Sequence, residues 1–586
     1  MTNAIIGFSL VTGLAPERRH RALAAQRTAL APFATLTHQA LSLGVSHLDL
    51  WGHGELSERL HRLPDGSLLV LVGSPHGTVS WAALPAAASA PEGAAFEIPW
   101  EGRVVLLKIS PDGRRWTLWN DWVGSIPVFH ATAEGGRAAS TLEPVLTAAV
   151  KATADDISLP GLLSLLINGH TVGDQTLVRS IHVVASDSVT TWDDNGQASR
   201  RLWTVVPGED RAEESWDDLV DQMYEHSRAA IAETLSAAPR WILPLSGGLD
   251  SRLIAAVGAS LGVEAHAYAW GSPDTADVVH SRQVARALDI PWKGIELGSD
   301  YLVRYTQQWA RMFGGTLHFH GMYQMAFLDA IADEPPAPIL TGYVGDIVSA
   351  HPLVGRGPTR YQLYDEWYTH WSPAELHTLL TCPVGDALEE LASDVTDQVQ
   401  ALPGTAFKRS MLAEAWSRQR VFSSFQSTLS DYWRGVGTPL AGRAYARFCL
   451  SLPRGALDGR RLLADVYRRH YPRMAVIPGT YGTEPFIRTG RYLLMKRLAD
   501  ALPAGLRVGA LRGFRTVDPR MDTACVQAHG WDALWPLQEA RRELADWMDL
   551  SKIDAAYREV MTDSRDVRPL RKLQSVQAFA CQLLHS

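Results

Sequence analysis

The stretch PLSGGLDSRL, from Pro244 to Leu253, places two adjacent glycines between serines and an aspartate. The apolar run WILPL precedes the glycines, and the helix-like run DSRLIAAVGASLG follows them. Gly247 and Gly248 let the backbone approach a ligand closely and adopt angles that other residues resist. A helix that begins near Asp250 would direct its unpaired N–H groups and its positive dipole end at the bend. The stretch therefore predicts an anion-binding turn between a buried strand and a helix.

The pattern of strand and helix continues beyond this turn. The runs EAHAYAWG and WKGIEL are typical of strands, and the run DVVHSRQVARALD between them has apolar residues at helical spacing. This alternation predicts a doubly wound parallel sheet with right-handed crossovers. In such a sheet ligands bind beyond the carboxyl ends of the strands, where the turn at 245–251 is expected. From about residue 355 onward helical patterns dominate.

The first two hundred residues have a different character. Short apolar runs separated by turns, such as SLLVLVG, RVVLLKI and RWTLWND, predict a β-rich layered domain. The segment VVPGEDRAEES, which contains Pro207 and Gly208, is typical of a linker that runs into a helix. We therefore expect one domain at 1–208, a second at 209–586, and a fold of the α/β plus α+β class.

The composition excludes several classes of protein. The chain has 586 residues, a net charge of -8 and four cysteines without a CxxC pair. It has no run of about 18 apolar residues, and its N-terminus lacks the features of a signal peptide. These features predict a cytoplasmic protein without disulfides or zinc that binds neither membrane nor nucleic acid. His318 and His320 have the spacing of ligands on a strand, but without a third clustered ligand we expect no metal there.

The glycine turn carries groups suited to a phosphate. Ser246 and Ser251 add hydroxyl donors on both sides of the bend. Asp250 would repel a bare phosphate, so we expect a bridging divalent cation, and Mg²⁺ is favoured because it binds through few carboxylates together with phosphate oxygens. A single serine or aspartate here would be explained equally well by helix capping. The chain has no GxxxxGK[ST] motif, which argues against a Walker-type γ-phosphate transferase.

Three segments together resemble one superfamily of enzymes. SGGLDS resembles the pyrophosphate loop of the ATP pyrophosphatases, which leave AMP on an acceptor carboxylate. AYAWGSPDTADVVHSRQVARALDI, at 267–290, is similar to the adenine-contacting segment of the asparagine synthetase superfamily, and LTGYVGDIVSAH, at 340–351, resembles its second active-site turn. The resemblance implies that Asp250 and Asp346 hold Mg²⁺. It also implies that ATP is bound by Leu245, Ser246, Gly247, Gly248, Asp250, Ser251, Ala269, Trp270, Gly271 and Gly345.

The N-terminal half also resembles this superfamily. RRWTLWNDWVGSIPVFHATAEGGRAASTLEPVL, at 114–146, is similar to part of its glutamine-amidotransferase-like domain of the Ntn type. A glutamine-hydrolysing member needs a cysteine directly after the initiator methionine. This chain has Thr2 and Asn3 there and lacks the glutamine-binding motif NGEIYN. We therefore expect a degenerate, inactive glutaminase domain, and an amine that comes from the substrate itself.

Two families keep such an inactive domain beside an active synthetase domain: the β-lactam synthetases and the lasso peptide cyclases. Tyr343 matches the tyrosine that, paired with a glutamate, deprotonates the amine in the β-lactam enzymes, and Glu375 is one candidate for that glutamate. The ring-closing lysine of those enzymes has no counterpart, which counts against a β-lactam enzyme. The cations nearest to its expected place are Arg473, Arg488, Arg491 and Lys496.

The segment at 433–472 resembles the late helical region of the lasso cyclases, in which Leu-Ser-Leu-Pro precedes a basic helix. The superfamily's usual Pro-x-x-Asp is Pro-Leu-Ala-Gly at 439–442, which leaves the role of that aspartate open. A basic helix usually exposes its charged side chains to solvent. In this setting four arginines of the segment could steer a peptide or phosphate: Arg443, Arg447, Arg468 and Arg469.

We therefore expect an ATP-dependent, AMP-forming carbon–nitrogen ligase, specifically a lasso peptide macrolactam synthetase. It would adenylate an Asp or Glu side chain of a leader-free precursor peptide, and the peptide's N-terminal amine would then close an isopeptide ring. Expected partners are the precursor core peptide, a leader peptidase and a leader-recognition protein. The alternatives are another amide-forming synthetase of the superfamily and a non-catalytic ATP- or peptide-binding protein. The precursor, the ring size, the choice of Asp or Glu and the oligomeric state stay open.

Overall fold

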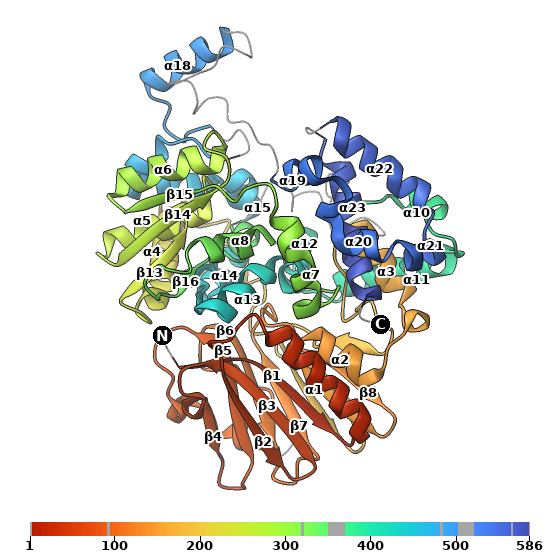
Figure 1. The fold of residues 1–586 in the computed structure, drawn as a ribbon. Helices are drawn as coiled ribbons and strands as arrows, with labels where there is room; N and C mark the ends of the chain where they lie inside the picture. Colours follow the sequence, from red (N-terminus) through yellow and green to blue (C-terminus); the bar gives the residue numbers. More distant parts are fainter. Residues whose placement is uncertain are drawn as a thin grey trace.

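A large, mostly antiparallel sheet forms the lower part of the molecule in Figure 1. The computed structural model describes residues 3–90, 94–317, 322–349, 370–480, 484–501, 521–563 and 566–584. The sheet runs in the order β10-β8-β9-β1-β5-β6-β7-β11-β12, while β3 pairs with β1 and β2, and β4 pairs with β5. Its strands are β1 (Ala4–Thr12), β2 (Thr37–Leu43), β3 (Ser46–His53), β4 (Leu60–Arg62), β5 (Leu68–Pro75), β6 (Gly102–Ile109), β7 (Trp116–Asn120), β8 (Phe129–Ala133), β9 (Gly136–Ser140), β10 (Ile181–Val183), β11 (Ser188–Asp193) and β12 (Gly196–Arg201).

The central strand β1 is buried on both faces of this sheet, and its side chains, which point to opposite sides of the strand, enter two apolar cores. Strand β1 contributes Phe8 and Leu10 to one apolar core. It contributes Ile6 and Val11 to a second core, which includes side chains of α1 (Pro16–Leu30) and α2 (Glu143–Val150). The helix α3 (Leu159–Asn168) completes the helical cover of this N-terminal part.

The second sheet is parallel and has the order β15-β14-β13-β16-β17. The chain runs from β13 through the intervening helices to β14 and β15 on one side, and β16 then returns to the other side of β13. Such a reversal leaves a crevice at the carboxyl ends of the two strands that flank it, here β13 and β16. The elements are α4 (Trp216–Leu235), β13 (Arg240–Pro244), α5 (Leu249–Ser260), β14 (Glu264–Trp270), α6 (Ala276–Leu288), β15 (Trp292–Ile295), α7 (Tyr301–Phe313), α8 (Met322–Ala330), β16 (Ile339–Leu340), α9 (Gly345–Val348) and β17 (Val436–Gly437).

Helices make up most of the C-terminal part. They are α10 (Pro373–Leu379), α11 (Gly385–Gln400), α12 (Ala406–Glu414), the π-helix η8 (Ala415–Ser423), α13 (Ser424–Trp433), α14 (Arg443–Ser451), α15 (Arg454–Leu457), α16 (Arg461–His470), α17 (Pro472–Ala475), α18 (Gly490–Ala501), α19 (Met521–His529), α20 (Trp535–Glu539), α21 (Arg541–Trp547), α22 (Leu550–Thr562) and α23 (Arg568–Leu583). Within the described ranges no helix is long and apolar enough to cross a membrane.

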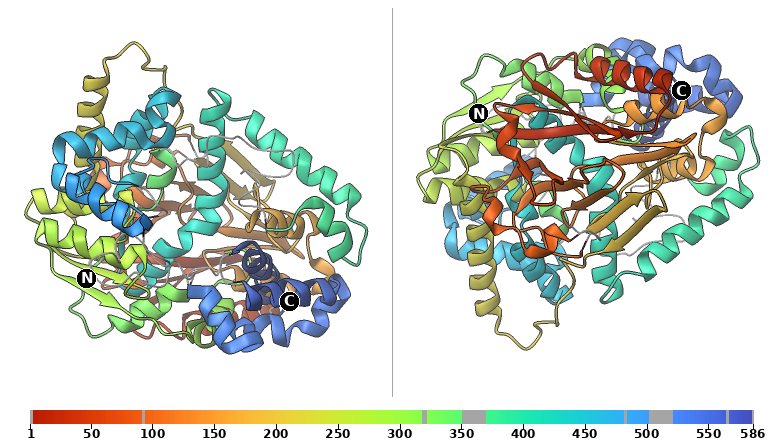
Figure 2. Two further views of the ribbon diagram at one scale, coloured as in Figure 1. Left: turned by 90° about the horizontal axis from the view of Figure 1, so that it is seen from above. Right: turned by 90° about the horizontal axis from the view of Figure 1, so that it is seen from below.

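The C-terminal helices pack back onto the N-terminal part. Helix α3 contacts α11 and α23, and α7 contacts α1 and α2, as the views in Figure 2 also show for the blue C-terminal helices beside the orange segments. Glu143 of α2 is buried in this contact and accepts hydrogen bonds from the N–H and hydroxyl of Thr316, at 2.9 and 2.7 Å. One apolar core therefore joins residues from both sides of the linker.

The cysteines are all free thiols. Cys449, Cys525 and Cys581 are buried, and Cys382 is half-buried. Three residues weighed in the sequence lie outside the described residues: Thr2, His318 and His320.

Candidate active site

Two turns of remote sequence meet at the crevice between β13 and β16. The loop at 245–248 leads from β13 into α5, and the turn at 341–344 leads from β16 into α9. A Cβ atom built on Gly345 would lie 2.8 Å from Cγ of Asp250, so this carboxyl group packs directly against the second turn. Burial raises the pKa of Asp250, Arg460 lowers it and Asp346 raises it again. The two aspartates therefore share one electrostatic environment.

The glycine loop is held by hydrogen bonds within itself and to α6. The N–H of Gly248 donates to Oγ of Ser246 at 3.0 Å, and the N–H of Ser246 donates to Oγ of Ser251 at 3.2 Å. The N–H of Gly247 donates to Oδ1 of Asp277 at 3.0 Å. Gly248 is the N-cap of α5, and no side chain caps this helix. The first turn of α5 can therefore offer N–H groups to a bound anion.

Neither glycine of this loop needs a left-handed backbone, so that part of the sequence-based expectation is wrong. The φ angle of Gly248 is -70°, and Gly247 is not among the glycines with positive φ. The loop needs glycine because its neighbours approach closely. A Cβ atom on Gly247 would lie 2.9 Å from Cγ2 of Thr480 and 3.0 Å from Cβ of His280.

Two arginines pair with the two aspartates. Both terminal nitrogens of Arg460 lie 3.3 Å from the carboxylate of Asp250, and Nη1 of Arg418 lies 3.6 Å from Oδ2 of Asp346. Burial alone would lower the pKa of Arg460, but Asp250 and Asp346 raise it above its ordinary value. Arg460 has a φ of 55° and follows Gly459 at 61°, a conformation that is uncommon for a non-glycine residue. The fold thus accepts backbone strain where it places this guanidinium.

Tyr343 lies in the turn beside Asp346 and is buried. Its hydroxyl donates to the backbone carbonyl of Gln419 at 2.8 Å, and burial raises its pKa. A protonated hydroxyl in this setting is better suited to positioning a group than to accepting a proton. The next residue, Val344, has a φ of 69°, which is a genuine outlier for a β-branched side chain. Strain of this kind clusters at functional turns.

An aromatic slot lies at the end of β14. The ring of Trp270 is 4.4 Å from that of Phe327 and 6.0 Å from that of Tyr323, centroid to centroid. These rings and the backbone of Ala269 and Gly271 line the same cavity as the glycine loop. An apolar aromatic wall next to polar backbone groups suits a planar base.

Replacement of Trp270 by alanine is expected to weaken ATP binding by about tenfold, because stacking of a base on an aromatic ring contributes roughly 1–3 kcal/mol. The measurement is the dissociation constant for ATP by titration calorimetry. Trp216→Ala is the matched control, since Trp216 is exposed on α4 and pairs with Asp465 at the surface. Equal ATP affinity in the two variants would place the base elsewhere.

The loop, the turn and the slot line one cavity of about 530 Å³, a size typical of small-molecule sites. Among the described residues that line it, Asp250, Asp277, Asp346 and Asp522 are acidic and Arg418 is basic. Such a cavity repels a bare polyphosphate but accepts one that carries a divalent cation. Within the described part of the chain no group of three or more His, Cys, Asp or Glu side chains could hold a metal ion. Two carboxylates completed by phosphate oxygens nevertheless fit Mg²⁺, which needs few protein ligands.

The residues that the resemblance assigned to ATP fall into two groups, those that line the cavity and those that pack behind its lining. Gly247 and Gly345 support the site from behind: the first donates to Asp277, and the second packs against Asp250. The others line the cavity directly: Leu245, Ser246, Gly248, Asp250, Ser251, Ala269, Trp270 and Gly271.

Several candidate side chains lie elsewhere. Glu375 forms a capping box with Ser372 at the start of α10 and pairs with Lys572 at 2.6 Å. Arg488 and Lys496 both pair with Glu484. The cavity lining, as far as the structure describes it, includes neither Glu375 nor any of the cations Arg473, Arg488, Arg491 and Lys496.

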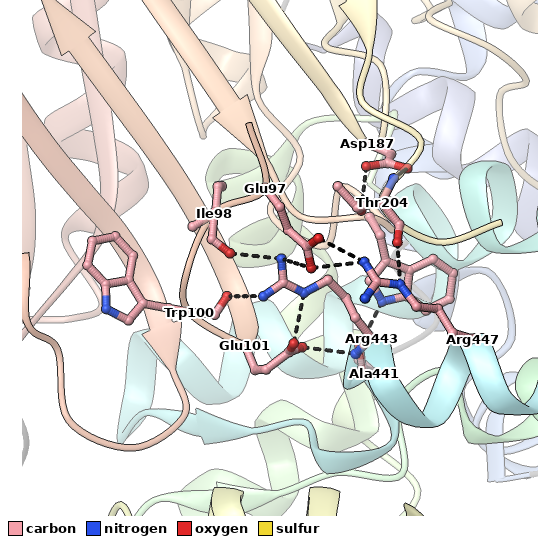
Figure 3. Close-up of polar contacts among 10 residues, drawn as sticks. Glu97, Ile98, Trp100, Glu101, Asp187, Thr204, Ala441, Arg443 and Arg447 are labelled. Atoms are coloured by element: carbon pink, nitrogen blue, oxygen red, sulfur yellow. Dashed lines mark hydrogen bonds and ion pairs between the residues drawn. The ribbon is translucent and has the colours of Figure 1, made fainter. Parts of the chain in front are cut away.

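Helix α14, which precedes the basic helix, joins the two parts of the chain (Figure 3). Nε of Arg443 donates to Glu101 at 2.8 Å, and Nη1 donates to the carbonyl of Ile98 at 2.8 Å. Arg447 donates to Glu97 at 2.9 Å and to the carbonyl of Thr204 at 2.6 Å. These arginines are therefore committed to the contact with the N-terminal part rather than to steering a peptide or phosphate.

The arginines at the end of α16 also have acidic partners, but these lie within the second part of the chain. Arg468 pairs with Asp465, and Arg469 pairs with Asp217 and Asp221 of α4. At the position of the superfamily's Pro-x-x-Asp, the carbonyl of Ala441 accepts a hydrogen bond from Nε1 of Trp122 at 2.7 Å. The motif here makes a contact with the N-terminal part.

Several side chains of the site were not predicted from the sequence, and among them are Asp277, Arg418 and Arg460. Asp277 lies in the first turn of α6, and an acidic residue there, directly after a strand of the parallel sheet, could have been recognised as facing the same edge. Arg418 and Arg460 lie in helical sequence without a motif. Only the packing of the chain brings them to Asp346 and Asp250.

The fold and the site together define an α/β protein with a glycine loop at the N-terminus of a helix and an acidic cavity beside it. Residues 224–433 match the family described as asparagine synthase. This stretch contains Asp250, Asp346 and Arg418. The match supports placing the chain in the asparagine synthetase superfamily, and it indicates ATP-dependent formation of a carbon–nitrogen bond.

Beyond this family, the chain has distant similarity to solved structures. No curated protein sequence matches the chain. Among solved structures, the glutamine phosphoribosylpyrophosphate amidotransferase from B. subtilis complexed with ADP and GMP is similar at a TM-score of 0.21 and 9% identity, over 49% of this chain and 65% of that one. A structure of the allosteric regulatory enzyme of purine biosynthesis has a TM-score of 0.22 and 8% identity, over 49% of this chain and 80% of that one. Similarity of this size does not identify a function.

Proposed function

We propose that this protein is an ATP-dependent macrolactam synthetase that acts on a lasso precursor peptide. It would adenylate the side-chain carboxylate of an Asp or Glu in the leader-free peptide and join it to the peptide's N-terminal amine. The observation that carries the ligase part of the proposal is the convergence of Asp250 and Asp346 on a cavity that begins at the glycine loop. The peptide specificity is supported by the resemblance of the late helical region to the lasso cyclases.

In the first step an oxygen of the acceptor carboxylate attacks the α-phosphorus of ATP, the bond to the bridging oxygen breaks, and pyrophosphate leaves. The loop from Ser246 to Ser251 would hold the pyrophosphate through hydroxyl and N–H groups, since a helix N-terminus favours anions. Asp250 and Asp346 would hold the Mg²⁺ that offsets the charge of the polyphosphate. The aromatic slot at Trp270 would hold the adenine.

In the second step the peptide amine attacks the acyl carbon, the bond between that carbon and the phosphate oxygen breaks, and AMP leaves while the amine proton passes to its phosphate or to solvent. Tyr343 lines the same cavity as Asp346, and its hydroxyl would position the amine while it stays bonded to the carbonyl of Gln419. Holding the two ends of one peptide in reactive geometry can contribute about 7–11 kcal/mol in good intramolecular cases. Much of the catalysis would therefore come from positioning.

The proposal includes partners. The core peptide is the substrate, and a leader peptidase and a leader-recognition protein would deliver it. The cavity reaches Asp522 of α19 and Gln574 of α23, where Gln574 donates to Asp522 at 2.9 Å. These C-terminal helices would form the peptide side of the site.

The test is incubation with Mg-ATP and synthetic linear peptides that have a free N-terminal amine and one internal Asp or Glu. The expected product is lighter than the peptide by one water and resists carboxypeptidase, with one AMP and one pyrophosphate formed for each ring. AMP formation with free aspartate and ammonia instead would favour an asparagine-type synthetase. No AMP with any acceptor would contradict a ligase.

A further inference from the structure

The π-helix Ala415–Ser423 separates two sets of side chains. Trp416 and Arg420 face the N-terminal part: Arg201 lies 4.3 Å over the ring of Trp416, and Arg420 donates to the carbonyls of Val184 and Gly173. Arg418 and Gln419 instead line the cavity. Single stretches of π-helix are uncommon and are frequently found at functional sites.

Arg418 is held between two carboxylates. Its Nη1 lies 3.2 Å from Oε1 of Glu414, one helical turn earlier, and 3.6 Å from Oδ2 of Asp346. The side chain of Glu414 is 9% exposed, whereas that of Asp346 is 35% exposed and faces the cavity. Glu414 is therefore the inner anchor of the guanidinium, and Asp346 is its partner on the cavity side.

A substrate carboxylate entering this cavity meets mostly negative charge. Among the described lining residues Arg418 is the one basic side chain, against four aspartates. A divalent cation at Asp346 would compete with Arg418 for that carboxylate, because both are cations. The guanidinium would then keep its bond to Glu414 and turn its remaining N–H groups to another acceptor. Its planar fork matches a carboxylate, which it can bind through two parallel hydrogen bonds.

We propose that Arg418 binds the acceptor carboxylate of the substrate and orients it toward the α-phosphate, with Glu414 as its fixed anchor. This inference rests on the proposed function, since it takes the acceptor to be a carboxylate that attacks ATP. It assigns to an arginine on the π-helix a role in substrate binding that the two aspartates cannot fill. Gln419, which lies 3.4 Å from Oδ1 of Asp346, flanks the same position.

The experiment compares two forms of the enzyme, wild type and Arg418→Met, each with two peptides that differ only at the acceptor side chain. Full-length protein with Mg²⁺ and α,β-methylene-ATP, which cannot be cleaved between its α- and β-phosphates, is titrated separately with the active linear peptide and with its counterpart in which the internal Asp or Glu is changed to Asn or Gln. We expect the wild type to bind the carboxylate peptide at least about tenfold more tightly than the amide peptide, because hydrogen bonds to a charged group are stronger than those to a neutral one. In Arg418→Met this difference should vanish, while the ATP affinity stays within about threefold.

Arg418→Lys keeps the positive charge but not the planar guanidinium, so it should restore only part of the preference for the carboxylate peptide. This variant also tests the inference if Arg418→Met folds poorly. Arg114→Met is the control, since Arg114 is exposed and pairs with Asp194 at the surface. A full preference for the carboxylate peptide in Arg418→Met would overturn the inference and leave the proposed function intact. Absence of peptide-dependent AMP in the wild type would overturn the proposed function and this inference with it.

Discussion

Replacement of Asp346 by asparagine is expected to reduce pyrophosphate release by about 10³-fold or more, because the charge stabilisation that a bound metal supplies amounts to several kcal/mol and each 1.36 kcal/mol is a factor of ten. Asparagine keeps the size of the side chain and removes its charge. Asp346 is the better of the two aspartates to change, since it is partly exposed. Asp250→Asn would also leave Arg460 without its carboxylate, and an unpaired buried charge destabilises the fold.

The measurement is the initial rate of pyrophosphate release at saturating ATP and peptide, over a series of Mg²⁺ concentrations. If Asp346 holds the metal, the residual activity should need more Mg²⁺ than the wild type. Asp194→Asn is the control, because Asp194 is exposed and pairs with Arg114. Normal turnover in Asp346→Asn at ordinary Mg²⁺ would refute the metal assignment.

Gly345→Ala is expected to reduce turnover by about 10²-fold, because a shift of about 1 Å in a reacting group can cost that much. The new Cβ atom would lie 2.8 Å from Cγ and 2.9 Å from Oδ1 of Asp250, which no real Cβ tolerates. The carboxylate must move away from the turn that carries Asp346. The φ angle of Gly345 is not positive, so alanine adds no backbone strain of its own.

Leu440 offers a way to test the cause. Its Cδ1 would lie 2.5 Å from the same Cβ atom, so Gly345→Ala also crowds Leu440. The double variant Gly345→Ala/Leu440→Ala relieves that contact but not the one with Asp250, and it should keep the loss of about 10²-fold in turnover. Recovery of activity in the double variant would show that displacement of Asp250 is not the cause. Gly385→Ala is the neutral control, because nothing lies within 4 Å of its Cβ position.

The N-terminal part of the chain forms hydrogen bonds with segments that lie beside the site. Trp122 donates to the carbonyl of Ala441, the neighbour of Leu440, and Leu440 packs against Gly345. Arg420 of the π-helix is bound to carbonyls at 173 and 184. The N-terminal part thus contacts two segments next to the cavity: the one at 440–441 and the π-helix Ala415–Ser423.

The sequence alone was enough to locate the strand–turn–helix at 240–260 and the parallel sheet around it, because apolar periodicity and glycine spacing are local properties. The same locality explains why Ser246 and Ser251 were found, since they lie within one short motif at a strand end. Trp270 was assigned through the resemblance of its segment, and the rings that complete the aromatic slot, Phe327 and Tyr323, were not foreseen. Asp346 was found through its own turn. The expectation that Gly247 and Gly248 adopt angles other residues resist was wrong, since neither has a positive φ. At Gly247 glycine is needed because Thr480 and His280, which lie outside the loop, crowd its Cβ position.

Which charges face Asp250 and Asp346 was decided only by the tertiary structure. Arg460 reaches Asp250 across 210 positions, and Arg418 reaches Asp346 from a π-helix that no sequence pattern indicated. Arg443 and Arg447, which the sequence suggested for steering a peptide or phosphate, pair instead with Glu97 and Glu101 of the N-terminal part. Local sequence determines where strands, helices and turns begin. The partner of a long charged side chain depends on which remote segments pack beside it, and that is a property of the whole fold.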